Sequence, residues 1–549
     1  MAGGIIQLIA YGPQDIYLTN NPHITYFKVV YRRHTNFSIQ QFEAPFDDKP
    51  TFGKKASIKL FRLGDLATRM YIRVVLGDVP RTPGTNFAWI RRLGYFMFNE
   101  LELSIGGQTI DKHFGHWLNI WYELARKDKQ DRGYKKNIGD VDELTAYNDL
   151  DKPQYIMNIP LEFFFNRHFG LALPLIAIRY HEIYIKVTLE ERERLIIRDD
   201  NFTDFDSLRI LQMSLVTDYI YLDLEERRRF TENRHEYLIE QVQYLGEVGV
   251  EKYEFIRSLD FKHPVKELIW AMNNGNYTSG KKFLFYSNKD DWTNEINRFS
   301  RTILEQSILI LNNENNDLEE PPELGDWEKF PSNTSSTSST QSLKVINNNS
   351  TKNIWINVAS IKIGDYNITR KINAEIVLSS NNILNIFNID SEITTRDLSY
   401  PVEVINDTRV NVTTDVYVCQ YHNYGLYISG EENPFVYASL EYNGQPRFEE
   451  MNGLFFGVLQ PYRYHSNTPA TGINLYSFAD QPEILQPTGA SNMSEIETIY
   501  LKIGLNEAIN ETNEPTLDLL NLENRLYVYT FSYNIFRVMS GMAGIRYNE

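Results

Sequence analysis

The segment from Asn166 to Glu190 combines two hydrophobic patterns. In its second half, apolar side chains occupy every other position: Ile183, Ile185, Val187 and Leu189. This alternation predicts a β-strand that turns one face toward a core and the other toward water. The first half, residues 170–178, is continuously apolar, but it is interrupted by Pro174 and is too short to span a bilayer. A long strand entered through such a corner is typical of a sandwich of antiparallel sheets.

Similar strand patterns recur along the chain, separated by turns rich in Gly, Pro and Asn. In the first half they predict strands at residues 24–31, 56–61, 70–76 and 101–105. In the second half they predict strands at residues 265–271, 282–286, 353–363, 375–378, 416–420, 425–428 and 526–536. Aromatic residues, which favour strands, make up 13% of the chain. Short strands with turns between them predict a mainly β fold of the sandwich or jelly-roll type.

Three segments depart from the strand pattern. One face of a predicted helix at residues 114–126 carries Trp117, Ile120, Trp121 and Leu124. Residues 127–152 are polar and charged, so we expect an exposed loop there. Residues 1–22 contain the turn signals Gly12-Pro13 and Asn20-Asn21-Pro22, which predict an extended arm. Such an arm is either a floppy terminus or a segment that packs beneath its own domain or onto a neighbour.

Residues 312–353 have the composition of a low-complexity segment. Pro321-Pro322 and the Ser/Thr run at residues 332–340 lack the apolar surface that a packed core requires. We therefore expect a mobile, exposed loop, although a loop of this length is uncommon inside a compact domain.

The charge balance excludes some classes of partner. The net charge is −17, and neither terminus carries a block of Lys or Arg. A chain whose main partner is nucleic acid usually has a basic face or tail, so direct genome binding is not expected. No signal peptide or membrane insertion is expected, because the apolar residues 5–10 are too few. The single cysteine, Cys419, rules out an intrachain disulfide, fits folding in a reducing compartment, and is expected to be a small buried side chain in a strand.

Residues Gly275 to Lys281 fill the first seven places of a P-loop, but the eighth place holds Lys282 instead of Ser or Thr. The apolar residues 283–286 that follow favour a strand, whereas a P-loop opens a helix. We therefore interpret this stretch as a Gly-bounded connection between strands.

The histidines form no recognisable catalytic or metal site. His113 and His116 have a spacing that some metal sites use, but no second pair of ligands accompanies them. His181-Glu182 and His235-Glu236 lack the second histidine of a zinc-protease helix. No catalytic residue, metal ligand or cofactor is therefore predicted, and the chain is not expected to be an enzyme.

Glycosylation acceptor triplets are frequent, as chance alone produces in an Asn-rich chain. They occur at Asn36, Asn201, Asn276, Asn333, Asn348, Asn349, Asn367, Asn406, Asn411, Asn492 and Asn510. Those retained as candidates for a glycan-coated outer surface are Asn276, Asn333, Asn348, Asn349, Asn367, Asn406 and Asn411.

Residues 165–183 contain Phe-Asn-Arg, then Gly-Leu-Ala-Leu-Pro-Leu-Ile-Ala-Ile, and then Tyr-His-Glu-Ile. Other distinctive stretches lie at residues 7–22, 105–121, 219–241, 472–489 and 533–544. All of them resemble the major capsid proteins of the nucleocytoplasmic large DNA viruses, especially those of the algal-virus branch. The resemblance runs from residue 7 to residue 547 and is interrupted mainly at 127–152 and 300–355. At Ala490-Ser491 the chain departs from relatives that often have Thr-Cys, which leaves the fold expectation intact.

The resemblance implies two consecutive antiparallel, eight-stranded jelly rolls with short inserted helices and long loops. They would occupy residues 23–230 and 231–549, after an N-terminal arm at 1–22. It further implies a homotrimer that forms a pseudo-hexagonal block and tiles the icosahedral shell of a large double-stranded DNA virus. The implied partners are other copies of the chain, neighbouring blocks, minor capsid proteins beneath the shell and the host surface. The implied location is the virion, after synthesis in the host cytoplasm.

Two other functions stay open from the sequence. A minor capsid component is one, although vertex proteins of such viruses typically have a single jelly roll. A jelly-roll protein that binds or cleaves carbohydrate is the other. Cleavage would require a convergent pair of carboxylates, and no such pair is recognisable in the sequence.

Overall fold

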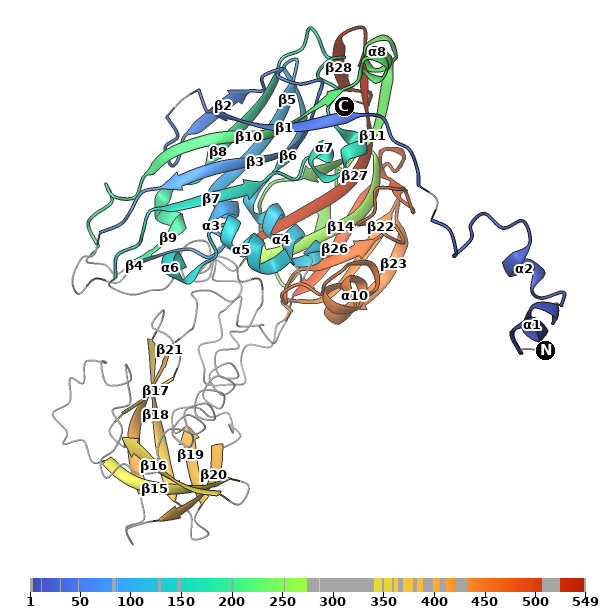
Figure 1. Ribbon diagram of the computed structural model, residues 1–549. Helices are drawn as coiled ribbons and strands as arrows, with labels where there is room; N and C mark the ends of the chain where they lie inside the picture. The colour runs from blue at the N-terminus through green and yellow to red at the C-terminus, as the bar shows by residue number, and fades with distance from the viewer. Residues whose placement is uncertain are drawn as a thin grey trace.

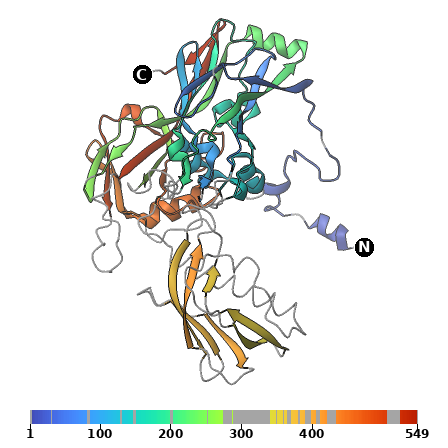
Figure 2. The ribbon, with the colours of Figure 1, turned by 90° about the vertical axis from the view of Figure 1, so that its left-hand side faces the viewer.

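The computed structural model describes residues 3–273 with short gaps, Tyr286, separate strands between residues 340 and 419, and residues 433–505 and 524–547. Two β-sandwiches built from consecutive parts of the chain make up its main body (Figure 1). The ribbon turned by 90° shows the two sandwiches side by side (Figure 2). Neighbours inside every sheet of the two sandwiches are antiparallel.

The first sandwich consists of two four-stranded sheets. One sheet has the order β1 (Phe37–Pro45), β10 (Ile210–Leu222), β3 (Leu66–Leu76), β7 (Tyr155–Pro160). The other has the order β2 (Lys55–Lys59), β8 (Ile183–Leu189), β5 (Phe98–Ile105), β6 (Gln108–His113). A short pair, β4 (Phe87–Trp89) with β9 (Ile196–Arg198), lies outside these sheets.

Strand β8 confirms the alternation predicted for the segment that ends at Glu190. Ile183, Ile185, Val187 and Leu189 are at most 2% exposed and belong to the hydrophobic core. The residues between them are half-buried or exposed. The predicted strands at 56–61, 70–76 and 101–105 are confirmed as β2, β3 and β5.

The second sandwich repeats the strand order of the first. One sheet has the order β11 (His235–Tyr244), β27 (Arg525–Met539), β14 (Pro264–Asn273), β24 (Asn474–Ser477). The other has the order β13 (Glu254–Ser258), β26 (Ile499–Leu505), β22 (Phe435–Tyr442), β23 (Gln445–Asn452). Short strands extend the first sheet: β12 (Val248–Gly249), β25 (Ser491–Asn492) and β28 (Met542–Ile545). The predicted strands at 265–271 and 526–536 are confirmed as β14 and β27.

Helix α8 (Leu224–Glu232) connects the two sandwiches. The carboxylate of Asp223 accepts a hydrogen bond from the backbone N–H of Glu226 at 3.0 Å, which caps the helix. Glu225 and Glu226 in the first turn and Arg229 in the last turn suit the helix dipole. The linker between the two sandwiches is therefore a capped, charged helix.

A separate seven-stranded sheet lies between β14 and β22 in the chain (Figure 1). Its strands are β15 (Thr340–Asn347), β16 (Ser350–Asn357), β17 (Ser360–Ile363), β18 (Thr369–Leu378), β19 (Ile383–Asn388), β20 (Leu398–Val404) and β21 (Asn411–Cys419). The strands predicted at 375–378 and 416–420 correspond to β18 and β21, and the range 353–363, predicted as one strand, contains the end of β16 and all of β17. These strands belong to this sheet and not to the second sandwich. Cys419 ends β21, as a strand residue should.

The prediction of a loop at residues 312–353 is wrong for the residues that form β15 and the start of β16. Residues 340–347 and 350–357 pair with each other in register as an antiparallel ladder. Alternating Leu343, Val345, Ile354 and Ile356 supply the strand pattern that the polar composition concealed. The rest of that expected loop, and the strand expected at 425–428, lie outside the described residues; so does the strand expected at 282–286, apart from Tyr286.

The N-terminal segment differs from its prediction in two ways. It contains two short helices, α1 (Gly3–Ile9) and α2 (Ile16–Thr19), in place of a uniformly extended chain. The strand predicted at residues 24–31 is wrong: its described residues form turns and irregular structure with no partner strand. A strand pattern alone does not make a strand when no sheet edge pairs with it. Both views show residues before β1 extending away from the sandwiches (Figures 1 and 2).

The helix predicted at 114–126 is confirmed as α4 (Gly115–Ala125). The exposed loop predicted at 127–152 is wrong, since it contains α5 (Asp131–Asn137) and α6 (Asp142–Thr145). Ile138 and Leu144 from this segment are fully buried. Asp140 is also buried and forms a bidentate ion pair with Arg91, with Nε to Oδ1 at 2.7 Å. The charge of Asp140 therefore serves an interior ion pair, which composition alone does not reveal.

Candidate assembly surfaces

The two sandwiches share one hydrophobic core along helix α4. Trp117 is fully buried, and its ring lies 5.6 Å from that of Tyr529 and 5.7 Å from that of Phe531, both on β27. Trp121 adds a contact of 5.2 Å with Phe531. Figure 1 shows α4 of the first sandwich against the second sandwich. Large apolar rings therefore pack the two sandwiches against each other, so that they are joined by an interface as well as by the connecting helix.

Strand β27 is buried on both faces, which explains why its aromatic pattern is so regular. Tyr527, Tyr529 and Phe531 point into the core that is shared with the first sandwich. Leu526 and Val528, which alternate with them, point into the core of the second sandwich. The alternation in this strand thus separates two cores and does not separate a core from water.

A network of buried charges crosses the same boundary. Arg167 on α7 (Phe164–Arg167) of the first sandwich donates to Glu240 on β11 of the second, with Nη1 to Oε2 at 3.0 Å. Lys266 on β14 is fully buried and also pairs with Glu240. Burial lowers the pKa of Lys266, and the neighbouring carboxylate of Glu240 opposes that shift. Because Glu240 neutralises cations from both sandwiches, it ties the two units in one fixed arrangement.

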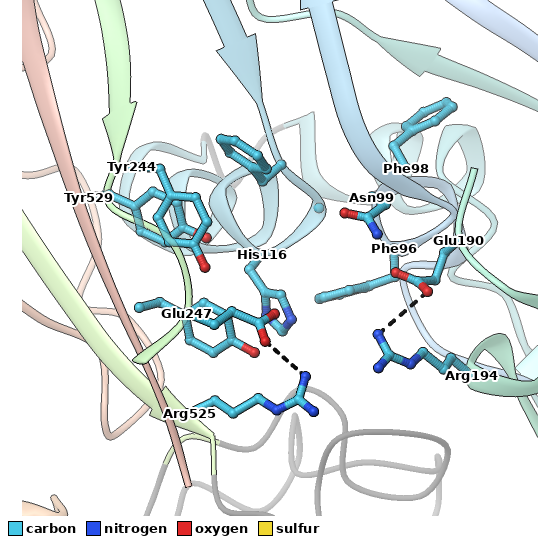
Figure 3. A pocket seen from close by; sticks show the side chains of 13 residues that line it. Phe96, Phe98, Asn99, His116, Glu190, Arg194, Tyr244, Glu247, Arg525 and Tyr529 are labelled. Atoms are coloured by element: carbon cyan, nitrogen blue, oxygen red, sulfur yellow. Dashed lines mark hydrogen bonds and ion pairs between the residues drawn. The ribbon is translucent and has the colours of Figure 1, made fainter. Parts of the chain in front are cut away.

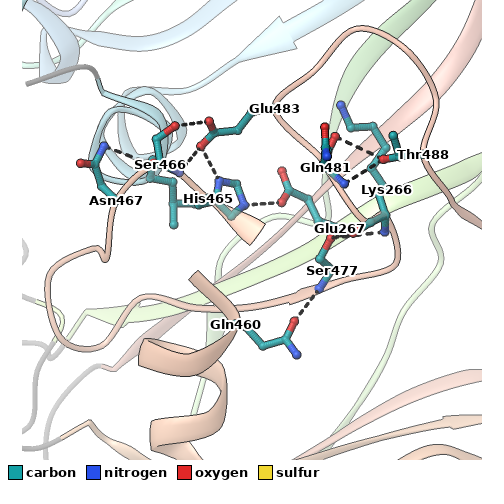
Figure 4. Close-up of polar contacts among 12 residues, drawn as sticks. Lys266, Glu267, Gln460, His465, Ser466, Asn467, Ser477, Gln481, Glu483 and Thr488 are labelled. Atoms are coloured by element: carbon teal, nitrogen blue, oxygen red, sulfur yellow. Dashed lines mark hydrogen bonds and ion pairs between the residues drawn. The ribbon is translucent and has the colours of Figure 1, made fainter. Parts of the chain in front are cut away.

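His465 forms a second buried polar cluster (Figure 4). Its Nε2 lies 2.8 Å from Oε2 of Glu267, and its Nδ1 lies 3.1 Å from Oε1 of Glu483. Burial alone lowers the pKa of His465, but the two carboxylates outweigh burial and raise the pKa to about 9. A charged imidazolium therefore holds the loop that carries Glu483 onto strand β14.

A pocket of about 140 Å³ opens at the boundary between the sandwiches (Figure 3). Arg525 and Glu247 form one ion pair on its wall at 2.8 Å, and Arg194 and Glu190 form another at 3.5 Å. His116 lies between them, and burial, followed by the two arginines, lowers its pKa to about 3. Its Nδ1 is 3.1 Å from the hydroxyl of Tyr286. A neutral imidazole stacked on aromatic rings suits packing at this boundary.

The other histidines considered from the sequence have separate packing roles. His113 lies 3.1 Å from Asp111 and stacks on Phe163, so it does not share a site with His116. The imidazole of His181 interacts with the backbone of Ala543, and that of His235 lies 2.7 Å from the carbonyl of Phe230. Within the residues that the structure describes, no group of three or more His, Cys, Asp or Glu is placed to hold a metal ion.

Other sequence candidates are placed only in part. The P-loop-like stretch at 275–282 lies outside the described residues. So do the glycosylation candidates Asn276, Asn333, Asn348, Asn349, Asn367 and Asn406, whereas Asn411 is the first residue of β21. Of the triplets not retained, Asn36 and Asn492 are exposed.

Several surfaces expose large apolar side chains, and two of them are considered first. The first is the arm, residues 3–36, in which Leu8, Tyr26, Phe27 and Tyr31 are between 82% and 98% exposed. The second is a helical face that follows β23 and was not recognised in the sequence; its residues are Leu454, Val458, Leu459 and Tyr462. No helix among the described residues is long and apolar enough to cross a membrane. Exposed apolar patches of this kind are candidate interaction sites.

Two sandwiches of identical strand order, fixed side by side through a shared core, define a double-sandwich building block. Comparison with known proteins shows which protein family has this building block. The family model for the N-terminus of major capsid proteins matches residues 25–223. The model for the large eukaryotic DNA virus major capsid protein matches residues 226–323 and 331–544. The chain therefore belongs to the family of major capsid proteins of large eukaryotic DNA viruses.

Individual relatives agree with this assignment over their whole length. Capsid protein 1 of Acanthamoeba polyphaga mimivirus is 35% identical over 605 residues, with both chains fully covered. The major capsid protein of Phaeocystis pouchetii virus is 32% identical over 586 residues, again with full coverage of both. The solved structure of VP54 of the virus PBCV-1 superposes with a TM-score of 0.64 at 26% identity, covering 96% of this chain and 100% of VP54. The protein is thus a structural component of the viral capsid, with the double jelly-roll fold of its relatives.

Proposed function

We propose that the protein is the homotrimeric, pseudo-hexagonal block from which an icosahedral shell is tiled. The observation that carries this proposal is the repeated strand order. Both sandwiches contain a sheet in which the first strand neighbours the last long strand, β1 beside β10 and β11 beside β27. With four strands in each main sheet, each sandwich would be an eight-stranded jelly roll. The first would lie within residues 23–230, after the arm, and the second within residues 231–549, around the inserted seven-stranded sheet.

The two similar barrels supply the geometry of a near-hexagon. Three copies related by a threefold axis place six barrels in a ring, and a closed ring requires head-to-tail contacts between copies. The rigid boundary at α4 and β27 fixes the angle between the two barrels of one chain. The same angle, repeated between chains, closes the ring.

Other partners follow from the remaining surfaces. The exposed arm at residues 3–36 would contact a neighbouring block or a minor capsid protein beneath the shell, because its apolar side chains have no cover within one chain. Contact with the host surface would come from outward loops, and the Asn candidates named above would carry any glycans. The chain acts as a structural protein without catalysis or cofactor. Its net charge of −17 argues against direct contact with the genome.

The mass of the purified protein in solution tests this proposal. Light scattering across a dilution series should give the mass of three chains at every concentration, and electron microscopy should show hexagonal particles. A stable monomer would contradict the trimer. It would favour one of the two other functions, a minor capsid component or a carbohydrate-binding protein. Binding to immobilised glycans would then distinguish between these two.

A further inference from the structure

A short helical segment on the second sandwich presents an uncovered apolar face. It starts directly after β23 and consists of a π-helical turn, η7 (Phe455–Leu459), and α10 (Gln460–Tyr464). Phe456 and Gln460 anchor its inner side. On the other side, Leu454 is 68% exposed, Val458 48%, Leu459 51% and Tyr462 79%. Positions 454, 458 and 462 are four apart, so they lie along one side of the segment and form one patch, here called the outer helix face.

The first sandwich has a helix in the equivalent place, and that helix is covered. Helix α4 starts directly after β6, and β6 and β23 both stand at the end of their sheets in the same strand order. Trp117 and Trp121 of α4 are also four residues apart, and both pack against Phe531 on β27 of the next sandwich. The second helical segment is shorter than α4 and begins with a π-helical turn. Its outer side chains are exposed, whereas those of α4 pack against the neighbouring sandwich.

The sheets that would receive these helices also correspond. On the sheet that covers α4, Glu240 on β11 pairs with Lys266 on β14, and Arg167 from the first sandwich completes the cluster. On the equivalent sheet of the first sandwich, Glu43 on β1 pairs with Arg73 on β3 at 2.5 Å. That pair is about one-third exposed, at 35% for Glu43 and 34% for Arg73.

Exposed apolar side chains surround the open pair. Phe37 and Ile39 on β1 are 50% and 46% exposed, and Ile156 on β7 is 53% exposed. Phe42 and Ala44 on β1 pack against the sandwich core, so Ile39 and Glu43, which alternate with them, lie on the opposite side of the sheet. Their partners on β10, Ile220 and Val216, are buried. The sheet face is therefore an apolar surface with a polar centre, which is the composition of the covered face in the second sandwich.

From this correspondence we propose that the outer helix face of one copy packs on the β1-β10-β3-β7 sheet of a second copy. The inference rests on the proposed trimer and names the surfaces that join its chains. Charge favours the match, because Arg463 is exposed beside Tyr462 and the receiving sheet carries Asp218, whose hydrogen-bond partner Gln41 is neutral. Each chain has one helix face and one open sheet, so three copies satisfy both surfaces in a closed ring.

A double substitution with a matched control tests the contact. Val458→Glu with Tyr462→Glu places two carboxylates on the outer helix face, so the mass measured by light scattering should fall threefold, to that of one chain. The control Ile256→Glu changes a residue that is 61% exposed on β13, at the opposite edge of the same sheet from β23, and should leave the mass unchanged. Circular dichroism establishes that both variants are folded. A trimeric double variant would overturn this inference and leave the proposed function standing, whereas a monomeric unmodified protein would overturn both.

Cross-linking gives an independent readout that needs no disruptive change. With Cys419→Ser as background, Tyr462→Cys and Ile39→Cys are combined in one chain and treated with a bifunctional maleimide. Covalent species of two and three chains are expected. The pair Ile256→Cys and Ile39→Cys should give single chains. Equal yields from the two pairs would contradict the proposed contact.

Discussion

Arg167 of the first sandwich and Glu240 of the second form an ion pair at 3.0 Å, across the boundary between the two barrels. The guanidinium of Arg167 also lies 4.5 Å above the ring of Phe531. Glu240 is 8% exposed, so its charge relies on this partner and on Lys266. Charges taken this far from water are costly unless they are paired, and the geometry here pairs them.

Replacing Arg167 with Met should therefore destabilise the protein strongly. The change leaves Glu240 with one cation in place of two in a buried site, and breaking such a pair typically costs about 3–5 kcal/mol. Urea unfolding followed by tryptophan fluorescence measures the loss. As a control, Lys59→Met removes the exposed ion pair with Glu182 and should change little. Equal losses from the two variants would show that burial of the Arg167 pair carries no special weight.

Trp117 should be the most sensitive position on α4. Trp117→Ala leaves a cavity between the two sandwiches and is expected to cost about 3–5 kcal/mol of unfolding free energy. Trp117→Phe keeps part of the ring and should cost less. The urea midpoint at constant slope measures both. If both variants cost the same, the loss would come from something other than packing against Tyr529 and Phe531.

The His465 cluster should make the protein less stable in alkali. The folded-state pKa is about 9, and the ordinary value is 6.5. A group whose pKa is raised on folding stabilises fully below its unfolded pKa, so this contribution is complete below pH 6.5 and is lost as pH rises to 9. The size is about 3 kcal/mol.

The measurement is unfolding free energy at fixed protein concentration from pH 6.5 to 9, for the unmodified chain and for His465→Gln. The variant should lose the part of the decline that comes from this imidazolium. His34→Gln on the exposed arm is the control and should retain the decline. Parallel curves for all three proteins would contradict the role of the Glu267–His465–Glu483 contacts.

The arm should be dispensable for folding of the barrels. Its side chains are exposed, so trypsin should cut first near Lys28, Arg32 and Arg33 in the free protein. Mass spectrometry identifies the cut, and the melting temperature of the trimmed chain should remain within about 1 °C of the original, as expected for a surface segment. Assembled shells should resist this cleavage. Cleavage at the same rate in shells would contradict the proposed contact of the arm with a neighbour.

The sequence predicted the elements whose pattern reports directly on burial. Strand β8 and helix α4 were predicted correctly because each buries a face whose period is visible in the sequence. The strand at 24–31 failed for the opposite reason: Tyr26 and Phe27 have a strand pattern but find no partner in one chain. The segment 127–152 failed because its carboxylate Asp140 is buried against Arg91, a long-range pairing that composition does not show.

The assembly surfaces were harder to predict than the fold. The outer helix face has an apolar residue at every fourth position from 454 to 462, and that spacing also occurs in core helices. Only the structure shows that these side chains are exposed, while Trp117 and Trp121 on the equivalent helix are covered. The charge network of Arg167, Glu240 and Lys266 likewise joins residues from three separate elements.

The seven-stranded sheet is an insertion in the chain of the second barrel, and the first barrel has no equivalent sheet among its described residues. It is inserted between β14 and β22, which end and begin at residues 273 and 435, whereas the equivalent strands β3 and β5 are separated only by residues 77–97. In the proposed trimer, three of the six barrels would carry an inserted sheet, and barrels with and without it would alternate around the ring. Such a chain can thus change the inserted sheet of its second barrel. Its first barrel, which has no such insertion between β3 and β5, keeps the shape that neighbouring blocks must fit.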